Sequence, residues 1–316
     1  MTNAFVFPGQ GSQIVGMGQE LAQAFPVARA VFDEVDDALG EKLSDVMRDG
    51  PQEELTLTQN AQPALMAVSM AVVRVLEAEL GITVKGHAKF VAGHSLGEYS
   101  ALAAAGTFSI ADAARLLRTR GLAMQAAVPV GQGAMVALLG VGLDVARKLA
   151  EEAAQEGEVC QVANDNEPTQ VVLSGSKTAV DRIQDIGKAH GVRRAVPLPV
   201  SAPFHCSLMQ PAADAMAEAL AAAQVHAPVV PVVSNVTAGP LSDPEDIKAS
   251  LVQQVTDTVR WRECVLTMTG AGVTSFYELG CGKVLSGLAR RIEKSVAATP
   301  IGAPDDLKVI AEALKS

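Results

Sequence analysis

The sequence predicts an α/β protein in which a large domain is interrupted by a smaller inserted one. Short apolar stretches alternate with longer amphipathic ones, which is typical of strands that alternate with helices. Aromatic residues make up only 3% of the 316 residues while alanine and valine abound, a composition that suits close-packed helix and sheet layers. After residue 128 the order of the elements changes, which indicates the insertion.

The first part of the chain is predicted to hold two strands and several helices. The strands are expected at 3–8, before the turn-rich "PGQGSQ", and at 88–94, before a glycine-flanked turn. Apolar residues at helical spacing predict helices over 16–49 (broken near Gly40 and Gly50), 60–80, 95–105 and 109–127.

Residues 129–198 are predicted to form a small ferredoxin-like α+β domain, because their pattern has the β-α-β-β-α-β order of that unit. Its elements are expected at 133–140, 142–154, 159–163, 169–174, 176–189 and 192–197. The proline-rich "VPLPVSAPFH" then returns to the large domain, which comprises 1–128 and 199–316. Its second part is predicted as a helix at 207–223, a strand at 230–235, helices at 244–255 and 260–270, a strand at 273–279 and a helix near 282–292.

Composition argues against several classes of function. Hydrophobic residues make up 49% and the formal net charge is −10, so we expect a folded protein and not a general nucleic-acid binder. No apolar run approaches the ~18 residues of a membrane span, and "MTNAFVFPGQ" lacks the basic region of a signal peptide. Four cysteines without C-x-x-C spacing favour a reducing cytoplasm over a disulfide framework or a zinc site. They are Cys160, Cys206, Cys264 and Cys281.

The stretch "FVAGHSLGEYS" (90–100) has the G-x-S-x-G spacing of a serine held on a sharp turn between a strand and a helix. Such a turn exposes the hydroxyl of Ser95 and aims the following amide, that of Leu96, at a developing oxyanion. The residue pattern alone leaves two interpretations open, a nucleophile or an ordinary helix-capping serine.

The candidate base is His205, in "SAPFHCS" on a proline-stiffened loop before a helix, where catalytic groups are often placed. A structural role for this histidine stays open. His94 adjoins Ser95, so its side chain should point elsewhere, and the other three histidines lie in polar or turn-like contexts. The loop "FPGQGSQ" lacks the third glycine of a dinucleotide fingerprint and the G-K-[ST] of a P-loop. It offers either a second oxyanion donor, the Gln10 amide, or simply a tight turn.

Six motifs together resemble the malonyl-CoA:acyl carrier protein transacylase family over essentially the whole chain. They are "GQGSQ" (9–13), "GHSLGEYS" (93–100), "RG" (120–121), "GAM" (133–135), "SAPFHC" (201–206) and "GKVLSGL" (282–288). The resemblance implies a hydrolase-like α/β core with a parallel sheet, interrupted by the ferredoxin-like insert. It also implies that Ser95 is the acylated nucleophile, that His205 is its general base, and that the Gln10 and Leu96 amides form the oxyanion hole.

Further residues take expected roles from the same resemblance. Gln254 of "LVQQV" matches the glutamine near the main-chain carbonyl that orients the histidine, so no acidic third member is expected. Arg120 matches the arginine that pairs with the malonyl carboxylate, and a guanidinium can grip that group with two parallel charge-assisted bonds. Spacing alone would make Arg120 a solvated helix residue. The candidate substrate contacts are Phe204, Asn164, Asn166 and Met135. In related acyltransferase domains, a phenylalanine at the position of Phe204 accompanies a preference for malonyl over the bulkier methylmalonyl group.

The implied partners are malonyl-CoA and acyl carrier protein, with no metal and no cofactor beyond the coenzyme A thioester. We expect a cytoplasmic monomer. Because carrier proteins of this pathway are acidic, a local basic patch should receive them. Its candidate residues are Lys188, Arg193, Arg194, Lys283, Arg290 and Arg291. The alternatives are a trans-acting polyketide malonyltransferase, a serine thioesterase or esterase, and a binding module with a vestigial site, against which the set Ser95, His205 and Arg120 argues.

Overall fold

The computed structural model describes residues 2–200 and 202–315, and its large domain is built on a six-stranded sheet. The strand order is β10-β9-β1-β2-β7-β8, parallel except for the last pair. The strands are β1 (Asn3–Phe7), β2 (Phe90–Gly93), β7 (Val232–Val233), β8 (Pro240–Leu241), β9 (Ser275–Leu279) and β10 (Ala297–Ile301). This confirms the predicted α/β class with a parallel core sheet.

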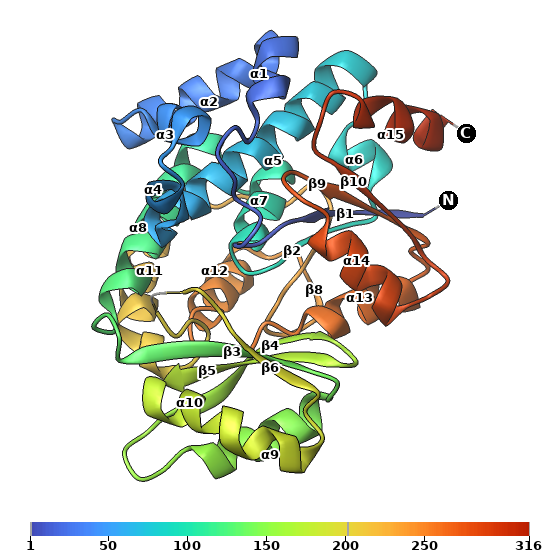
Figure 1. Ribbon diagram of the computed structural model, residues 1–316. Coiled ribbons are helices and arrows are strands. Elements are labelled where there is room, and N and C mark those ends of the chain that lie inside the picture. Colours follow the sequence, from blue (N-terminus) through green and yellow to red (C-terminus); the bar gives the residue numbers. More distant parts are fainter. Residues whose placement is uncertain (1, 201, 316) are drawn as a thin grey trace.

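Helices cover both faces of this sheet, which explains why β1 is apolar from Ala4 to Phe7 (Figure 1). Phe5 and Phe7 pack on one face against helices that include α2, α5, α7, α8 and α11, whereas Ala4 and Val6 face α13 and α14. The helices are α1 (Gln19–Ala24), α2 (Pro26–Leu39), α3 (Leu43–Asp49), α4 (Gln52–Thr56), α5 (Thr58–Leu80), α6 (Val84–His87), α7 (Leu96–Ala104), α8 (Ile110–Ala126), α11 (Gln210–Ala222), α12 (Pro244–Gln253), α13 (Trp261–Gly270), α14 (Val284–Ile292) and α15 (Asp306–Lys315), with the short η2 (Ser207–Met209) before α11.

A second, antiparallel sheet of order β4-β5-β3-β6 lies below the first in Figure 1. Its elements are β3 (Gly133–Leu139), α9 (Leu143–Ala153), β4 (Cys160–Glu167), β5 (Gln170–Ser176), α10 (Lys177–Ile186), η1 (Gly187–His190) and β6 (Arg194–Pro197). Val136 and Leu138 of β3 pack with α9 and α10 in a separate core. The predicted β-α-β-β-α-β order is confirmed, while the domain boundaries at 129 and 198 stay a prediction.

The structure differs from the predicted elements at the strand expected at 159–163, which continues to Glu167, and around residue 232. The strand expected at 230–235 shrinks to two residues, because the chain turns at Ser234, whose carbonyl accepts from the Ala238 amide at 2.9 Å. The short β8 was not predicted, and neither were β10 and α15 at the end of the chain. None of the helices described by the structure has the length and apolar character needed to cross a membrane.

Candidate active site

Ser95 lies on a strained turn between β2 and α7, with φ 54° and ψ −111°. The turn requires glycine on both sides. A Cβ at Gly93 would lie 1.9 Å from the carbonyl carbon of Gly97, and a Cβ at Gly97 would lie 2.2 Å from the Phe7 carbonyl oxygen. The predicted strand-turn-helix elbow is therefore present, and its backbone is held in a conformation that costs on the order of 1–3 kcal/mol.

Gly93→Ala should destabilise the fold by more than about 3 kcal/mol, because the added methyl group would overlap backbone atoms that have no room to move. Gly270→Ala is the matched control, since a Cβ there meets nothing within 4 Å in α13. Urea denaturation followed by circular dichroism measures both changes. Equal midpoints for the two variants would mean that the elbow does not depend on the small residue at 93.

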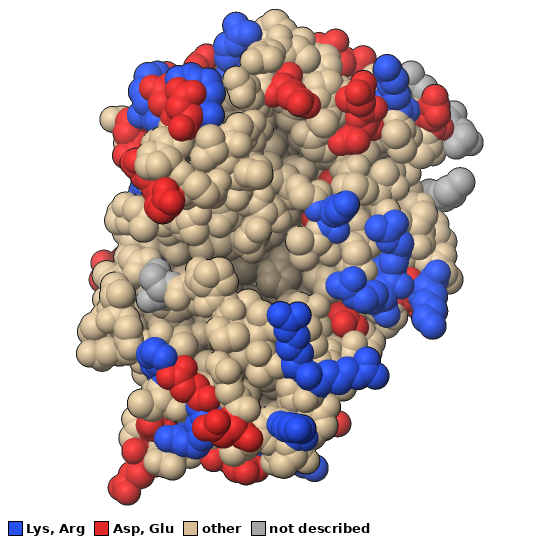
Figure 2. Space-filling view, in the orientation of Figure 1, with Lys and Arg blue, Asp and Glu red and all other residues tan. Residues whose placement is uncertain are grey.

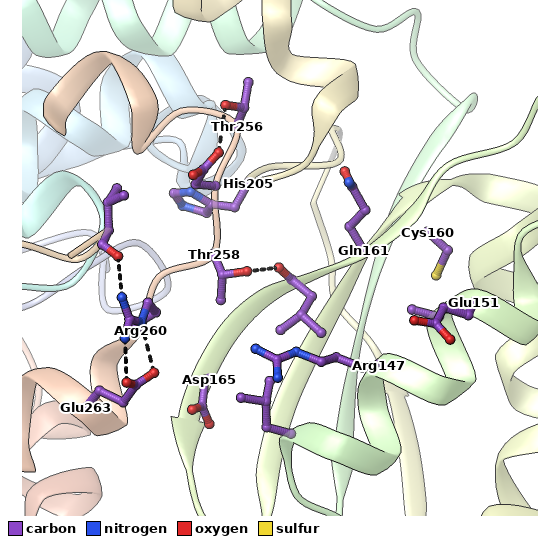
Figure 3. Close-up of a pocket in the computed structure, with 15 residues that line it drawn as sticks. Arg147, Glu151, Cys160, Gln161, Asp165, His205, Thr256, Thr258, Arg260 and Glu263 are labelled. Atoms are coloured by element: carbon purple, nitrogen blue, oxygen red, sulfur yellow. Dashed lines mark hydrogen bonds and ion pairs between the residues drawn. The ribbon is translucent and has the colours of Figure 1, made fainter. Parts of the chain in front are cut away.

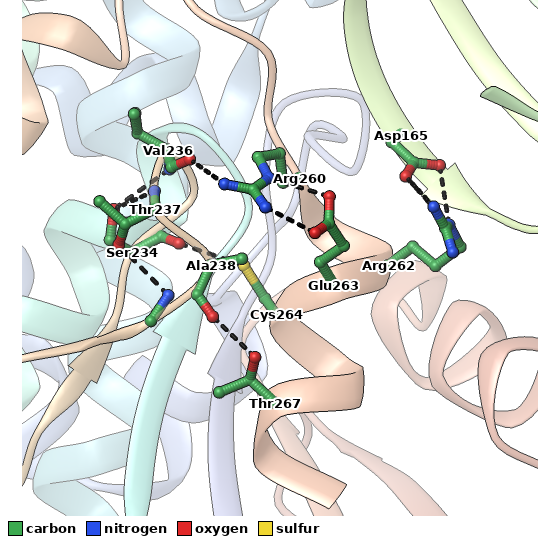
Figure 4. Close-up of polar contacts among 11 residues, drawn as sticks. Asp165, Ser234, Val236, Thr237, Ala238, Arg260, Arg262, Glu263, Cys264 and Thr267 are labelled. Carbon is green, nitrogen blue, oxygen red and sulfur yellow. Dashed lines mark hydrogen bonds and ion pairs between the residues drawn. The ribbon is translucent and has the colours of Figure 1, made fainter. Parts of the chain in front are cut away.

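Asn235 holds the elbow from the turn after β7. Its Nδ2 donates to the Gly93 carbonyl oxygen at 2.7 Å, and its Oδ1 accepts from the Ser95 amide at 2.7 Å. This turn is itself tied to α13 and its N-cap residue, as Figure 4 shows: Arg260 Nη1 donates to the Val236 carbonyl oxygen at 2.9 Å, and Thr267 Oγ1 donates to the Ala238 carbonyl oxygen at 2.7 Å. The anchored turn keeps the Asn235 amide in place against the strained backbone.

Ser95 and His205 form a hydrogen-bonded pair, with 2.8 Å between Ser95 Oγ and His205 Nε2. The other ring nitrogen, Nδ1, lies 2.8 Å from the Gln254 carbonyl oxygen. A carbonyl oxygen only accepts, so Nδ1 carries the proton and Nε2 accepts the Ser95 hydroxyl. Burial, together with the nearby Arg120 charge, lowers the pKa of His205 to about 3. The ring is therefore neutral, which is the form that can take a proton from Ser95.

Arg120 reaches the same hydroxyl from α8. Its Nη2 donates to Ser95 Oγ at 3.1 Å and to Gln254 Oε1 at 2.9 Å, and its Nη1 donates to Gln62 Oε1 at 2.8 Å. The residue is only 1% exposed, so this is no solvated helix arginine. Burial lowers the pKa of the guanidinium, but two glutamines supply fixed acceptors, and its Nε has no partner among the described residues. The guanidinium is held rigidly with donors to spare for an anionic ligand.

The main-chain amides of Leu96 and Gln10 are the expected oxyanion donors, and this role stays a prediction. Leu96 is the first residue of α7, where helix N–H groups have no intrahelical acceptor. Gln10 lines the cavity around Ser95, and its side chain is anchored to Thr58 Oγ1 at 3.4 Å. A Cβ at Gly9 would lie 2.7 Å from the His94 carbonyl oxygen, so the loop before Gln10 passes close to the elbow.

These groups share one cavity of about 400 Å³, which Ser95, His205, Arg120 and Gln10 all line. Its remaining wall is largely apolar and includes three of the predicted substrate contacts, Met135, Phe204 and Asn164. Asn166 lies in the adjoining cavity of about 440 Å³, where its Oδ1 accepts from His94 Nε2 at 2.8 Å. His94 is thus turned away from Ser95, as predicted. Ser201, the first residue of "SAPFHC", lies outside the described residues.

The two asparagines are set in place by the residue between them. Asp165, 1% exposed, accepts from Arg262 Nε at 2.9 Å, which ties β4 to α13 (Figure 4). Because side chains alternate along a strand, this pair points Asn164 and Asn166 the other way, toward the cavities. The contact joins the small sheet to the large domain.

A larger cavity, of about 550 Å³, lies on the other side of His205 between α9, β4 and the segment 256–263 (Figure 3). Ser95 and Arg120 do not line it, and Arg260 in its wall is paired with Glu263, to which its Nε donates at 2.9 Å. The candidate active site is therefore the smaller cavity, which brings the nucleophile, the base and the cation together. Within the described ranges, no cluster of three or more histidine, cysteine, aspartate or glutamate side chains could hold a metal ion.

The six predicted basic residues are all exposed. Lys283 and Arg291 line the cavity that adjoins the Ser95 cavity, together with Gln10 and His94, whereas the other four line neither. Figure 2 shows lysine and arginine side chains gathered along one rim of the central hollow, over α13 and α14 and down onto the small sheet. The opposite rim carries few charges in this view.

Three polar residues of the site escaped the sequence analysis: Gln62, Asn235 and Glu98. Glu98 stands within the motif "GHSLGEYS", but the hydrogen-bond partners of all three residues lie far away along the chain. The one available signal was "QPA" in an otherwise apolar helix, because a glutamine at a core position needs a polar partner.

Comparisons with known proteins agree with this geometry. The family model of the acyl transferase domain matches residues 4–296. The chain is 46% identical to the malonyl CoA-acyl carrier protein transacylase of Escherichia coli (strain K12), over 98% of both chains. The crystal structure of acyl-carrier-protein-S-malonyltransferase from Bartonella henselae is 55% identical and superposes with a TM-score of 0.97 over 100% of each chain. A malonyl-transacylase solved in complex with a type II PKS acyl-carrier protein is 43% identical, with a TM-score of 0.95 over 99% of this chain and 100% of that one.

Proposed function

This chain belongs to the malonyl CoA-acyl carrier protein transacylase family, and from that premise we propose that it moves a malonyl group from malonyl-CoA to the phosphopantetheine thiol of acyl carrier protein, supplying fatty acid synthesis. It is an acyltransferase. The observation that carries the proposal for the site is the meeting of a base and a cation at one hydroxyl: His205 Nε2 lies 2.8 Å and Arg120 Nη2 lies 3.1 Å from Ser95 Oγ.

The first half of the reaction acylates Ser95. His205 Nε2 takes the hydroxyl proton as Oγ attacks the thioester carbonyl carbon, and the negative charge moves to the carbonyl oxygen. The Gln10 and Leu96 amides then donate to this oxyanion. When the intermediate collapses, the C–S bond breaks and the coenzyme A sulfur leaves with the proton from His205. A malonyl-seryl ester remains.

The second half reverses these steps with another thiol. The phosphopantetheine thiol of acyl carrier protein gives its proton to His205 Nε2 and attacks the ester carbonyl. Collapse breaks the bond to Ser95 Oγ, which regains the proton from the histidine. Throughout, the malonyl carboxylate is held by Arg120, whose buried guanidinium would gain a full counter-charge only from an acyl group that ends in an anion.

The proposed reaction needs no metal or cofactor besides the coenzyme A thioester itself, because the base, the oxyanion donors and the cation all belong to the chain. The side chains of Met135, Phe204 and Asn164 line the cavity and are proposed to contact the acyl group. We also propose a cytoplasmic location, which the four free thiols support.

Incubating the protein with malonyl-CoA and holo acyl carrier protein, and following free coenzyme A and intact carrier mass, tests the transfer. We expect malonyl carrier to form in step with coenzyme A release, and little release when carrier is left out. Rapid release to water without carrier would instead support the thioesterase alternative.

A second candidate function is malonyl transfer to a polyketide carrier in trans. It is favoured by the 43% identical malonyl-transacylase that was solved with a type II PKS acyl-carrier protein. The two candidates share one chemistry and differ only in the second substrate. Competition between a fatty acid carrier and a polyketide carrier in one reaction gives the ratio of their kcat/KM values, and the preferred carrier identifies the function.

We propose that the carrier docks on the basic patch defined above. The acidic protein as a whole repels an acidic carrier, so encounter depends on positive charge concentrated at the mouth of the site. Lys283 and Arg291 lie at the adjoining cavity, and Arg193 and Arg194 at the start of β6 extend the positive surface onto the small sheet.

Reversing charge at Arg193 and Arg194 to glutamate should raise the KM for acyl carrier protein about tenfold at low salt, because long-range attraction becomes repulsion. Acylation by malonyl-CoA alone should not change. Arg74→Glu, on the exposed side of α5, is the control for a charge reversal elsewhere. Carrier kinetics equal to wild type in the Arg193/Arg194 variant would place the docking surface elsewhere.

A further inference from the structure

Beneath the Ser95 elbow lies a buried carboxylate that the proposed mechanism does not use. Glu98 is 1% exposed and sits in the first turn of α7, three residues after Ser95. Its Oε2 accepts from the Asn235 main-chain N–H at 3.0 Å and from Gln254 Nε2 at 2.7 Å. Burying a carboxylate costs free energy that its hydrogen bonds must offset. Both donors belong to residues that touch the catalytic groups.

Gln254 joins Glu98 to the reacting groups. Its Oε1 accepts from Arg120 Nη2, its Nε2 also donates to the Ser95 carbonyl oxygen at 3.1 Å, and its main-chain oxygen accepts from His205 Nδ1. A guanidinium can only donate, and the Glu98 oxygen accepts two N–H groups. The side-chain amide of Gln254 therefore has one orientation that satisfies both ends, with oxygen toward Arg120 and nitrogen toward Glu98.

We propose that Glu98 is a positioning residue for acyl transfer, one that fixes the Gln254 amide and, through it, the Arg120 guanidinium that selects the malonyl group. This proposal rests on the function proposed above. Without the acceptor at Glu98, the Gln254 amide can rotate and turn N–H groups toward Arg120. The guanidinium then loses an acceptor and is no longer held at the distance that suits both Ser95 Oγ and a bound carboxylate.

The position of the acceptor, not its charge, is what the geometry requires. Both bonds end on a single oxygen, Oε2, which a glutamine can reproduce with its amide oxygen. Burial raises the pKa of Glu98 to about 7, while hydrogen bonds from Asn235 and Gln254 and the charge of Arg120 oppose the rise. The carboxyl group can thus be neutral at ordinary pH and still accept both bonds on Oε2.

Two conservative variants separate position from charge. Glu98→Gln keeps the length and an acceptor oxygen but removes the charge, whereas Glu98→Asp keeps the charge and withdraws the acceptor by about 1.5 Å. The readout is the rate of Ser95 acylation by malonyl-CoA and by acetyl-CoA, measured in single turnovers by intact-protein mass spectrometry. Asp36→Asn is the control, because this buried carboxylate serves only the start of α3, through Ser44 and Lys42.

Glu98→Gln should stay within about tenfold of wild type for malonyl and keep the malonyl-to-acetyl ratio. Glu98→Asp should lower the rate of Ser95 acylation about 100-fold with malonyl-CoA and clearly less with acetyl-CoA, because a misplaced Arg120 affects only the substrate whose carboxylate it binds. A merely structural role would lower both rates equally. The proposal is overturned if Glu98→Asp keeps the wild-type ratio, or if Glu98→Gln loses it. Failure of the wild-type protein to form a malonyl adduct would instead refute the proposed function.

Discussion

His205→Ala should lower the rate of Ser95 acylation by about 10⁴-fold, because the only base within hydrogen-bond reach of the Ser95 hydroxyl among the described residues is removed. The residual rate should come from the oxyanion donors and substrate binding. Stopped-flow release of coenzyme A from malonyl-CoA measures this rate. His226→Ala, an exposed histidine after α11, is the control and should match wild type. A His205→Ala enzyme within tenfold of wild type would show that another group takes the proton.

The same base predicts an unusual pH dependence. A free histidine gains its proton near pH 6.5, but burial lowers the pKa of His205 to about 3, so the neutral base persists far into acid. The acylation rate should then stay constant between pH 8 and about pH 5, without an inflection from this residue.

The lowered pKa of His205 makes the folded protein less stable in acid. Below about pH 6.5 the unfolded chain takes up a proton on this histidine and the folded chain does not, so the free energy of unfolding should fall from there toward pH 3.

Arg120→Ala should lower the malonyl acylation rate by at least about 100-fold, since two charge-assisted hydrogen bonds of about 1.5–3 kcal/mol each are lost. The acetyl group has no carboxylate for Arg120 to bind, so the acylation rate with acetyl-CoA should fall less and the selectivity should shift toward acetyl. Arg120→Lys keeps a charge but no fork, and should lie between the two.

Arg118→Ala is the matched control for this change. Arg118 lies two residues before Arg120 in α8, its Nη1 donates to Asn60 Oδ1 at 2.6 Å, and it does not line the Ser95 cavity. Competition between malonyl-CoA and acetyl-CoA, scored as the ratio of the two adducts, gives the selectivity directly. An unchanged ratio in Arg120→Ala would remove this arginine from substrate recognition.

Local patterns were enough to predict the frame of the site. β1 and β2 are short apolar runs followed by glycine-rich turns, and the spacing of Gly93, Ser95 and Gly97 permits one backbone path, the elbow. The β-α-β-β-α-β order was legible because each of its elements has its own periodicity. Where a strand depends on its neighbours, as with the two residues of β7, the length could not be predicted from the pattern.

The supporting contacts of the site could not be predicted in the same way. Gln62, Glu98 and Asn235 come from α5, α7 and a turn near residue 235, and they meet only when the sheet brings β1, β2 and β7 side by side. As single residues they read as polar positions in helices or turns. Arg120 shows the same limit: its helical spacing suggests a solvated residue, and its burial follows from acceptors more than fifty residues away in sequence.

The proposed mechanism requires an acyl group bonded to Ser95 while its carboxylate is held by Arg120. The most direct measurement is the mass of the intact protein after brief exposure to malonyl-CoA, followed by peptide mapping. We predict one malonyl group per chain, located on the peptide that contains Ser95 and absent in Ser95→Ala. Exposure to acetyl-CoA should give far less of the corresponding acetyl adduct. An active enzyme whose Ser95 stays unmodified, or whose acetyl adduct forms as fast as the malonyl one, would contradict the account.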